Sequence, residues 1–207
     1  MTLVAVTQRT AVVGQFDETR DTLDQRLTSW LGSSGFLVVP VPNFVAAVGS
    51  DGLAPLRSWI EQVSPGGVVL SGGDDPGEDQ YRDELEFGLL GMAKDIGLPV
   101  LGICRGMQMM AKWAGGSLVQ VSGHVGVRHQ ISGEMTGEVN SYHRLGIVEA
   151  PDGFVITAQS DDGVVEGMRH LDYHWEGWMW HPERDGVGPM TEVEQSRLRR
   201  IMFQSSR

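Results

Sequence analysis

The first half of the chain alternates short, almost continuously apolar runs with segments of helical periodicity. The apolar runs predict strands at residues 3–7, 35–41, 66–73 and 98–103. The segments between and after them predict helices at about 18–31, 54–63, 78–96 and 105–114. Gly115 and Gly116 provide the stop signal for the last of these helices. Apolar strands that alternate with helices are typical of a parallel sheet covered by helices on both faces.

After residue 115 the pattern changes to shorter β-rich runs. These predict strands within residues 117–121, 137–149, 153–158, 163–169 and 175–180, followed by a helix over roughly 189–204. We expect this part of the chain to add antiparallel strands at one edge of the same sheet. The prediction is therefore one three-layer α/β domain over residues 1–207, with a mostly parallel, flavodoxin-like central sheet and a late antiparallel edge.

Composition narrows the range of partners. The chain has 16 Lys and Arg against 27 Asp and Glu, which gives a formal net charge of −11. Such a charge repels nucleic acids and anionic membranes, so an anionic ligand would need a local basic patch. No run approaches the roughly 20 apolar residues of a membrane span, and the first residues do not resemble a signal peptide. Together with a single cysteine, which excludes an internal disulfide, these features predict a cytoplasmic protein.

That cysteine, Cys104, lies in the segment LGICRG, between a predicted strand and a predicted helix. Gly102 and Gly106 permit a sharp turn there, which would raise the intervening side chain at the carboxyl end of the sheet, as in a nucleophile elbow. A helix N-terminus also favours thiolate over thiol. A buried cysteine that only fills space in the core is the alternative interpretation.

The segment WHPERD supplies a base for such a nucleophile. His181 and Glu183 are two residues apart and would project to the same side of an extended segment, so the carboxylate could orient the imidazole. Cysteine, histidine and carboxylate are the three parts of an activated nucleophile. An oxyanion would need backbone donors, and the Gly72–Gly73 turn and the N–H of Arg105 are the candidates.

The segments RDELEFGLL, GLPVLGICRGMQMM, GGSLVQV, VNSYH, DDGVVEGM and WHPE resemble the class I, triad-type glutamine amidotransferases over about residues 66–185, and within them the γ-glutamyl hydrolase branch. The resemblance implies that Cys104 is the nucleophile, His181 the general base and acid, and Glu183 its orienting carboxylate. It also implies an oxyanion hole at Gly73 and Arg105. The implied glutamyl-binding residues are Gly72, Gln108, Asn140, Ser141, Tyr142 and His143.

A narrower likeness involves ETRDTLDQRLTSWL, ICRGMQMMA, QVSGHVGVRH and WHPER, which resemble hydrolases of bacterial capsule phosphoramidate biosynthesis. These split γ-glutamyl-CDP-amidate into glutamate and cytidine diphosphoramidate. The resemblance therefore implies a nucleotide-linked γ-glutamyl substrate. His124, Arg128 and His129 would face its diphosphate, and Arg9, Arg105 and Arg144 could join them. The branch places one more residue between its glycines and its aspartate, so no role follows for Asp74 and Asp75.

Other functions stay open at this point. The chain could be a glutaminase subunit that passes ammonia to a synthase, a hydrolase of another γ-glutamyl conjugate such as γ-glutamyl-GABA, or a non-enzymatic thiol sensor. The histidine spacings match no closed zinc motif, and the glycine turns match no phosphate or dinucleotide fingerprint, so we expect neither a metal nor a cofactor. The aromatic run WEGWMW is interpreted as core packing, although tryptophans could also supply the face of a homodimer.

Overall fold

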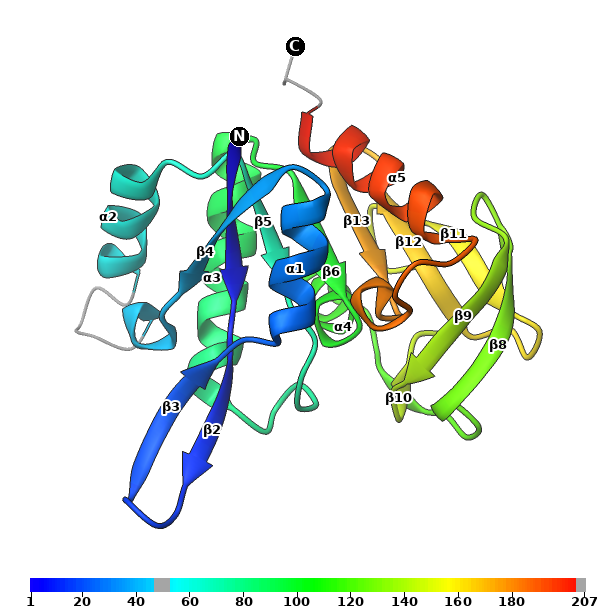
Figure 1. The fold of residues 1–207 in the computed structure, drawn as a ribbon, viewed down its shortest axis with the longest axis horizontal. Coiled ribbons are helices and arrows are strands. Elements are labelled where there is room, and N and C mark those ends of the chain that lie inside the picture. Colours follow the sequence, from blue (N-terminus) through cyan, green and yellow to red (C-terminus); the bar gives the residue numbers. More distant parts are fainter. Residues whose placement is uncertain (47–52, 204–207) are drawn as a thin grey trace.

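The computed structural model describes residues 1–46 and 53–203, and in these residues nine strands form one central sheet (Figure 1). Its strands are β1 (Thr2–Thr7), β4 (Phe36–Val41), β5 (Gly67–Leu70), β6 (Val100–Ile103), β8 (Val125–Gly133), β9 (Gly137–Tyr142), β11 (Phe154–Ser160), β12 (Val165–His170) and β13 (Trp175–Trp178). The helices are α1 (Gln25–Ser33), α2 (Ala54–Val63), α3 (Gln80–Ile96), α4 (Arg105–Trp113) and α5 (Thr191–Phe203), with 3-10 turns η1 (Asn43–Ala46) and η2 (Pro182–Arg184). Two small antiparallel pairs complete the fold: β2 (Arg9–Val13) with β3 (Glu18–Thr22), and β7 (Val119–Gln120) with β10 (Leu145–Gly146).

The sheet changes from parallel to antiparallel along its strand order, which is β4-β1-β5-β6-β13-β12-β11-β8-β9. The first five strands, from β4 to β13, are parallel to one another. Each neighbouring pair from β13 to β9 is antiparallel. The predicted parallel sheet with a late antiparallel edge is confirmed. Strand β13 nevertheless joins the parallel part beside β6, although it lies far along the chain, and this pairing positions the residues that follow it.

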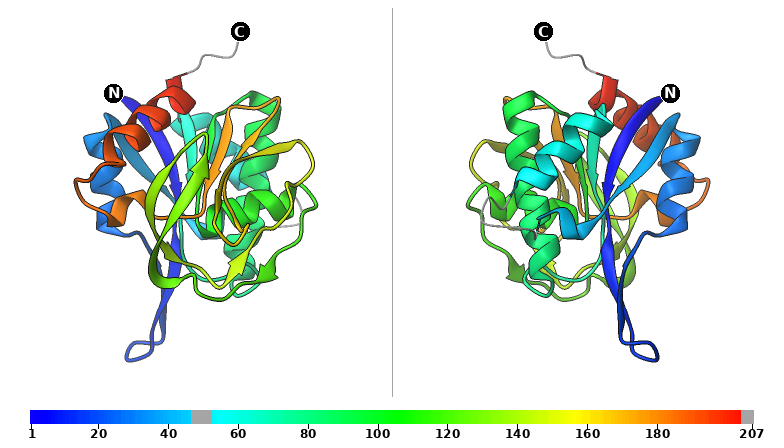
Figure 2. Two further views of the ribbon diagram at one scale, coloured as in Figure 1. Left: turned by 90° about the vertical axis from the view of Figure 1, so that its right-hand side faces the viewer. Right: turned by 90° about the vertical axis from the view of Figure 1, so that its left-hand side faces the viewer.

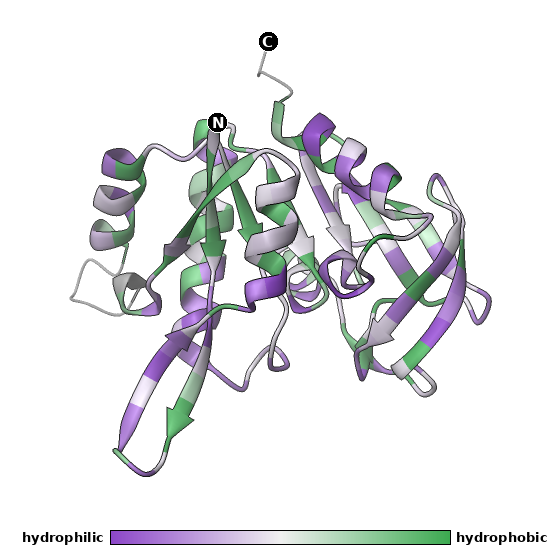
Figure 3. Cartoon of the chain, in the orientation of Figure 1, coloured by the Kyte–Doolittle hydropathy of each residue, from purple (hydrophilic) through white to green (hydrophobic). Residues whose placement is uncertain are grey.

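Helices cover both faces of the parallel strands (Figure 2). On one face, α2, α3 and α4 pack against alternate strand residues such as Ala5, Val68 and Val100. On the other face, α1 and α5 pack against the residues in between, including Val4 and Val69. The interior strands β1 and β5 are accordingly rich in hydrophobic residues, whereas β3 is hydrophilic (Figure 3). Because both sides of each strand are buried, these strands are apolar throughout rather than alternating.

The predicted helix over residues 18–31 is wrong in its first third. Residues 18–22 instead form β3, which pairs with β2 in a projecting hairpin (Figure 1). Asp24 has extended backbone angles and its side chain accepts a hydrogen bond from the N–H of Arg26 at 2.9 Å, so helix α1 begins only at Gln25. Both strands of the hairpin are largely exposed. Hydrophobic periodicity therefore carried no information about their pairing.

Two further elements differ from expectation. Residues 125–133, for which no strand was predicted, form the long strand β8. The last helix is confirmed and spans Thr191–Phe203. Residue 204 of the predicted range lies outside the described residues.

Within the described ranges, no helix combines the length and apolar character needed to cross a membrane.

The tryptophans pack in the core, as expected for the WEGWMW run. Trp175, Trp178 and Trp180 are almost completely buried, and the rings of Trp178 and Trp180 stack with their centroids 5.6 Å apart. Trp30 is also buried, and the remaining two tryptophans are partly buried against the same core. The homodimer for which the tryptophans could supply a face stays a prediction, to which the buried tryptophans add no support.

Candidate active site

The candidate catalytic residues follow three adjacent parallel strands. In the register of the sheet, Leu70 near the end of β5 pairs with Gly102 of β6, and Ile103 of β6 pairs with Trp178 of β13. The turn after β5 carries Gly72, Cys104 comes directly after β6, and His181 lies three residues beyond β13. The carboxyl edge of a parallel sheet is the usual place for ligands in this class of fold.

Cys104 sits on a strained turn between β6 and α4. Its backbone angles are φ 50° and ψ −104°, a region in which non-glycine residues cost about 1–3 kcal/mol. Its N–H donates to Trp178 O at 2.7 Å, which ties the turn to β13. A methyl group on Gly106 would overlap the carbonyl of Leu70, and one on Gly102 would lie 2.6 Å from the carbonyl carbon of Gly106. The two glycines therefore permit the nucleophile elbow that the sequence predicts.

His181 connects Cys104 to Glu183. The imidazole Nδ1 lies 2.7 Å from Glu183 Oε1, and both side chains are buried. Burial opposes the charge on His181, but hydrogen bonds with Cys104 and Glu183, and their negative charges, raise the pKa of the imidazole to about 9. A pKa raised in this way favours the imidazolium form of the ring near neutral pH.

Asn140 holds the backbone of His181 from β9. Its side-chain nitrogen donates to His181 O at 2.7 Å, and its oxygen accepts from His181 N at 3.0 Å. Tyr142, on the same strand, places its ring edge-on to the imidazole with centroids 5.9 Å apart. These contacts put two of the predicted glutamyl-binding residues next to the triad, where Asn140 positions the histidine.

The glycine turn after β5 lies against the histidine. A methyl group on Gly72 would be 2.5 Å from His181 Cε1. Beneath the turn, Arg82 of α3 donates through Nη2 to Ser71 O at 2.7 Å and to Gly72 O at 3.0 Å. Because a trans peptide directs its C=O and the following N–H in opposite directions, the N–H of Gly73 points away from Arg82.

A buried charge network supports both turns and was not found from the sequence. Glu86 of α3 accepts hydrogen bonds from Arg82 Nε at 3.0 Å and Thr7 Oγ1 at 2.8 Å, and it also pairs with the guanidinium of Arg105. Arg105 pairs with Asp83 as well. The segment RDELEFGLL thus places Arg82 and Glu86 one turn apart on the buried face of α3, with Asp83 beside them. Burial lowers the pKa of Arg82, an effect that the charge of Glu86 opposes.

Gln108 and residues 141–143 make mostly internal contacts. Gln108 Nε2 donates to Leu145 O at 2.8 Å, while its Oε1 is buried without a hydrogen-bond partner. Ser141 Oγ donates to His124 O at 2.7 Å, and His143 Nδ1 lies 3.0 Å from Leu145 O.

The base of the β2–β3 hairpin forms one wall of a small pocket beside His181 and Glu183, and this wall was not predicted from the sequence. The pocket is lined by Arg9, Thr22, Leu23, Asp24, Leu27, Ser71, Gly72, Gly73, His181, Glu183 and Arg184.

The cations expected to hold a diphosphate do not form one cluster. Arg128 and His129 are neighbours on β8 and therefore project to opposite faces. Arg128 pairs with Asp185 at 2.6 Å and Glu138 at 3.0 Å, whereas His124 and His129 lie against the buried Glu166.

The other three predicted cations are also paired. Arg9 lies 2.7 Å from Asp74 and Arg144 lies 3.3 Å from Asp75, and the guanidinium of Arg105 is buried in the charge network under the elbow. These contacts give Asp74 and Asp75 an observed role, since they attach the glycine turn to neighbouring segments.

Comparison with known proteins agrees with this arrangement. The family model described as glutamine amidotransferase class-I matches residues 31–193. Anthranilate synthase component 2 of Archaeoglobus fulgidus is 37% identical over 141 residues, covering 62% of this chain and 73% of that protein. The same component of Thermococcus kodakarensis is 34% identical over 157 residues, covering 69% and 76% respectively. GMP synthase (glutamine-hydrolyzing) of Bacillus subtilis is 30% identical over 134 residues, covering 60% of this chain and 25% of that protein.

Solved structures agree at the level of the fold. A glutamine amidotransferase from Thermotoga maritima superposes with a TM-score of 0.69 at 15% identity, covering 98% of both chains. The matched family segment includes the turn after β5, the elbow cysteine and the histidine–glutamate pair. The chain therefore belongs to the class-I glutamine amidotransferase family, whose members are cysteine amidohydrolases that act on glutamine-type amides.

Proposed function

We propose that the protein hydrolyses the side-chain amide of glutamine through a glutamyl thioester on Cys104, and supplies the ammonia to a separate synthase. The observation that carries the proposal is that Cys104 follows β6 and the His181–Glu183 pair follows the adjacent strand β13, with His181 Nδ1 2.7 Å from Glu183 Oε1 at the carboxyl edge of the sheet. The strained elbow and the raised pKa of His181 are the two features that such a nucleophile requires.

The reaction follows from these positions. The Cys104 thiolate attacks the γ-carbonyl carbon of the substrate. The N–H groups of Gly73 and Arg105 stabilise the oxyanion, since the first points away from Arg82 and the second belongs to the first residue of α4, where helical N–H groups lack an internal acceptor. The His181 imidazolium gives its proton to the departing nitrogen, which leaves as ammonia. The neutral ring then removes a proton from water, and hydroxide attack on the thioester releases glutamate and regenerates the thiolate.

The relatives support the delivery of ammonia to a partner. Two of them are named as the second component of anthranilate synthase, and others as glutamine-hydrolysing GMP synthases, of which this chain matches about a quarter. Each of these names describes either a component of a synthase or a synthase that hydrolyses glutamine. We infer by analogy that the partner of this chain is a synthase that consumes ammonia.

The γ-glutamyl-CDP-amidate reading is the second candidate, and it has less support. The narrower sequence likeness favours it, but each cation expected to hold its diphosphate faces a carboxylate. A diphosphate would have to displace several acidic partners in an already acidic protein. Capsule biosynthesis has no support from the relatives, which are amidotransferase components.

A substrate panel separates the two candidates. Glutamate release would be measured for the purified chain with L-glutamine, γ-glutamyl-GABA and γ-glutamyl-CDP-amidate. We expect kcat/KM for the nucleotide conjugate to be no higher than for glutamine, and Arg128→Ala to leave the ratio between the two substrates unchanged. A conjugate preference of roughly 100-fold, reduced by Arg128→Ala through KM, would instead establish the hydrolase reading, since lost phosphate contacts weaken binding.

The raised pKa of His181 predicts a pH profile. The imidazolium is needed to stabilise the thiolate and to protonate the leaving nitrogen, so kcat/KM should fall as pH rises through about 9. In Glu183→Gln, loss of the carboxylate charge removes one cause of the raised pKa, so the same descending limb should move to lower pH. A limb that stays in place in this variant would contradict the assigned role of Glu183. Glutamate release between pH 6 and 10 is the measurement, restricted to pH values at which circular dichroism shows an intact fold.

A further inference from the structure

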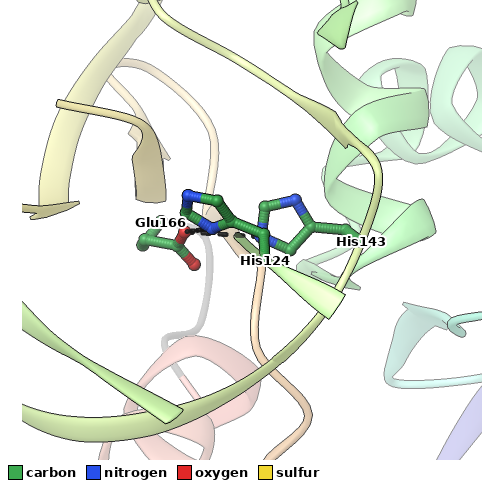
Figure 4. Close-up of side chains that lie close together, drawn as sticks. All are labelled: His124, His143 and Glu166. Carbon is green, nitrogen blue, oxygen red and sulfur yellow. Dashed lines mark ion pairs between the residues drawn. The ribbon is translucent and has the colours of Figure 1, made fainter. Parts of the chain in front are cut away.

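Three imidazoles and one carboxylate converge inside the antiparallel part of the molecule, and none of them belongs to the proposed triad of Cys104, His181 and Glu183. His124, His143 and Glu166 are all buried, and one ligand-type atom from each lies within 4.8 Å of the others (Figure 4). His129 approaches the same carboxylate from β8. The four residues come from the start of β8, its middle, the end of β9 and strand β12, so they meet only in the folded chain.

The distances from Glu166 to the imidazole nitrogens are those expected between two ligands of one metal ion. Glu166 Oε1 lies 3.3 Å from His124 Nδ1, 3.4 Å from His129 Nε2 and 3.4 Å from His143 Nε2. Zinc bonds nitrogen and oxygen at about 2.0–2.1 Å, which places two ligand atoms of a tetrahedral site about 3.3 Å apart. None of these facing atoms makes a well-formed hydrogen bond, although all are buried. Such atoms require another partner.

Hydrogen bonding alone does not satisfy this cluster. His124 has a carboxylate on each side, because its Nε2 lies 2.9 Å from Asp162 Oδ2 while Nδ1 faces Glu166. His143 likewise faces Leu145 O through Nδ1 and Glu166 through Nε2. To donate on both sides, each ring would have to be an imidazolium, and the two rings are only 4.7 Å apart between centroids. Two buried cations would then share one buried carboxylate, which is an expensive arrangement.

A bound cation removes this conflict. Each neutral ring would offer its free nitrogen to the metal and donate its other N–H outward, to Asp162 from His124 and to Leu145 O from His143. Histidines that bind metals are usually oriented in this way, by a carboxylate or a backbone carbonyl on the second nitrogen. We propose that His124, His143 and Glu166 form a structural site for a divalent transition metal, with Zn²⁺ as the ion that fits best and His129 beside the Glu166 carboxylate.

The site would fix a segment that reaches the active site. Leu145 O accepts both the His143 contact and the hydrogen bond from Gln108 on α4, the helix that begins at the elbow. Three residues before His143, Asn140 holds the backbone of His181. A metal would therefore anchor the connection between β9 and α4, without touching the reacting atoms.

Zinc binding to the full chain is the direct test. The purified protein, freed of metal with a chelator, would be dialysed against Zn²⁺ at low micromolar concentration and its metal content measured. We expect one Zn²⁺ per chain in the wild type, and a loss of at least about tenfold in affinity in Glu166→Gln and in His143→Gln. Co²⁺ in place of Zn²⁺ should give the visible absorption of a four-coordinate site, without a thiolate charge-transfer band.

Matched variants control for other ligands. Cys104→Ala and His174→Gln should each keep the full metal content, since His174 is partly buried outside the cluster and Cys104 is the only thiol in the chain. Removal of the metal from the wild type should lower Tm by about 5 °C or more, because the ion stabilises only the folded state. The proposal is overturned if the wild type binds no stoichiometric Zn²⁺, if Cys104→Ala abolishes binding, or if Glu166→Gln and His143→Gln both leave it unchanged. None of these readouts depends on amidohydrolase activity.

Discussion

Replacing Cys104 by alanine should lower kcat/KM for glutamine hydrolysis by roughly 10⁴-fold or more. The reason is that Sγ is the only group at the elbow able to form the glutamyl thioester, so no covalent route remains in the variant. Cys104→Ser should also be strongly impaired, because a serine hydroxyl does not ionise beside an imidazole as a thiol does and is the weaker nucleophile. Glutamate release with glutamine in large excess is the measurement.

The fold should survive this change, so a loss of activity in Cys104→Ala would report the loss of the thiol and not unfolding. Cys104 is buried but small, and alanine would adopt the same backbone angles at a similar cost. We expect the thermal transition to move by only a few degrees. Retention of more than a tenth of the wild-type activity in Cys104→Ala would exclude this residue as the nucleophile.

Gly106→Ala should have the largest effect on stability. The added methyl group would overlap the backbone carbonyl of Leu70, and neither the strand β5 nor the first turn of α4 can move without disturbing the elbow. We expect a loss of about 2–4 kcal/mol in the free energy of unfolding, measured by denaturant titration, together with a loss of activity in the fraction that still folds.

Gly91→Ala is the matched control for that substitution. Gly91 lies within α3, and a methyl group there meets no other atom within 4 Å. Alanine has the higher helix propensity, so this variant should be as stable as the wild type or up to about 1 kcal/mol more stable. If the two variants behaved alike, steric overlap at the elbow would not be the reason for the glycine.

The parallel core could be predicted from the sequence for a simple reason, and the same reasoning places the proposed triad at one edge of the sheet. Cys104 and His181 follow short apolar strands, and the carboxyl ends of parallel strands share one edge of a sheet. The spacing of His181 and Glu183 was sufficient to predict their contact, which is 2.7 Å in the structure. What the pattern could not predict is that β13 lies beside β6, and that pairing is what brings the histidine to the cysteine.

Charged groups were the main source of error. Arg105 was considered as an additional phosphate contact, but its guanidinium is buried against Asp83 and Glu86. A charge in a short sequence gives no sign of the acidic side chains that fold toward it. The β2–β3 hairpin was missed for a related reason, since an exposed hairpin has no buried face to leave a hydrophobic period. The residues of the proposed metal site, from His124 through His143 to Glu166, span 42 positions of the sequence (124 to 166) and match no local metal motif.

Covalent labelling of the wild-type chain tests the central claim most directly. The protein would be incubated with a diazoketone analogue of glutamine, whose electrophilic carbon takes the place of the γ-amide, and the modified peptide identified by mass spectrometry. The account predicts one adduct per chain on Cys104, slowed by added glutamine and lost above about pH 9 as His181 gives up its proton. An adduct on another residue, or labelling of Cys104 no faster than that of a free thiol and indifferent to glutamine, would contradict it.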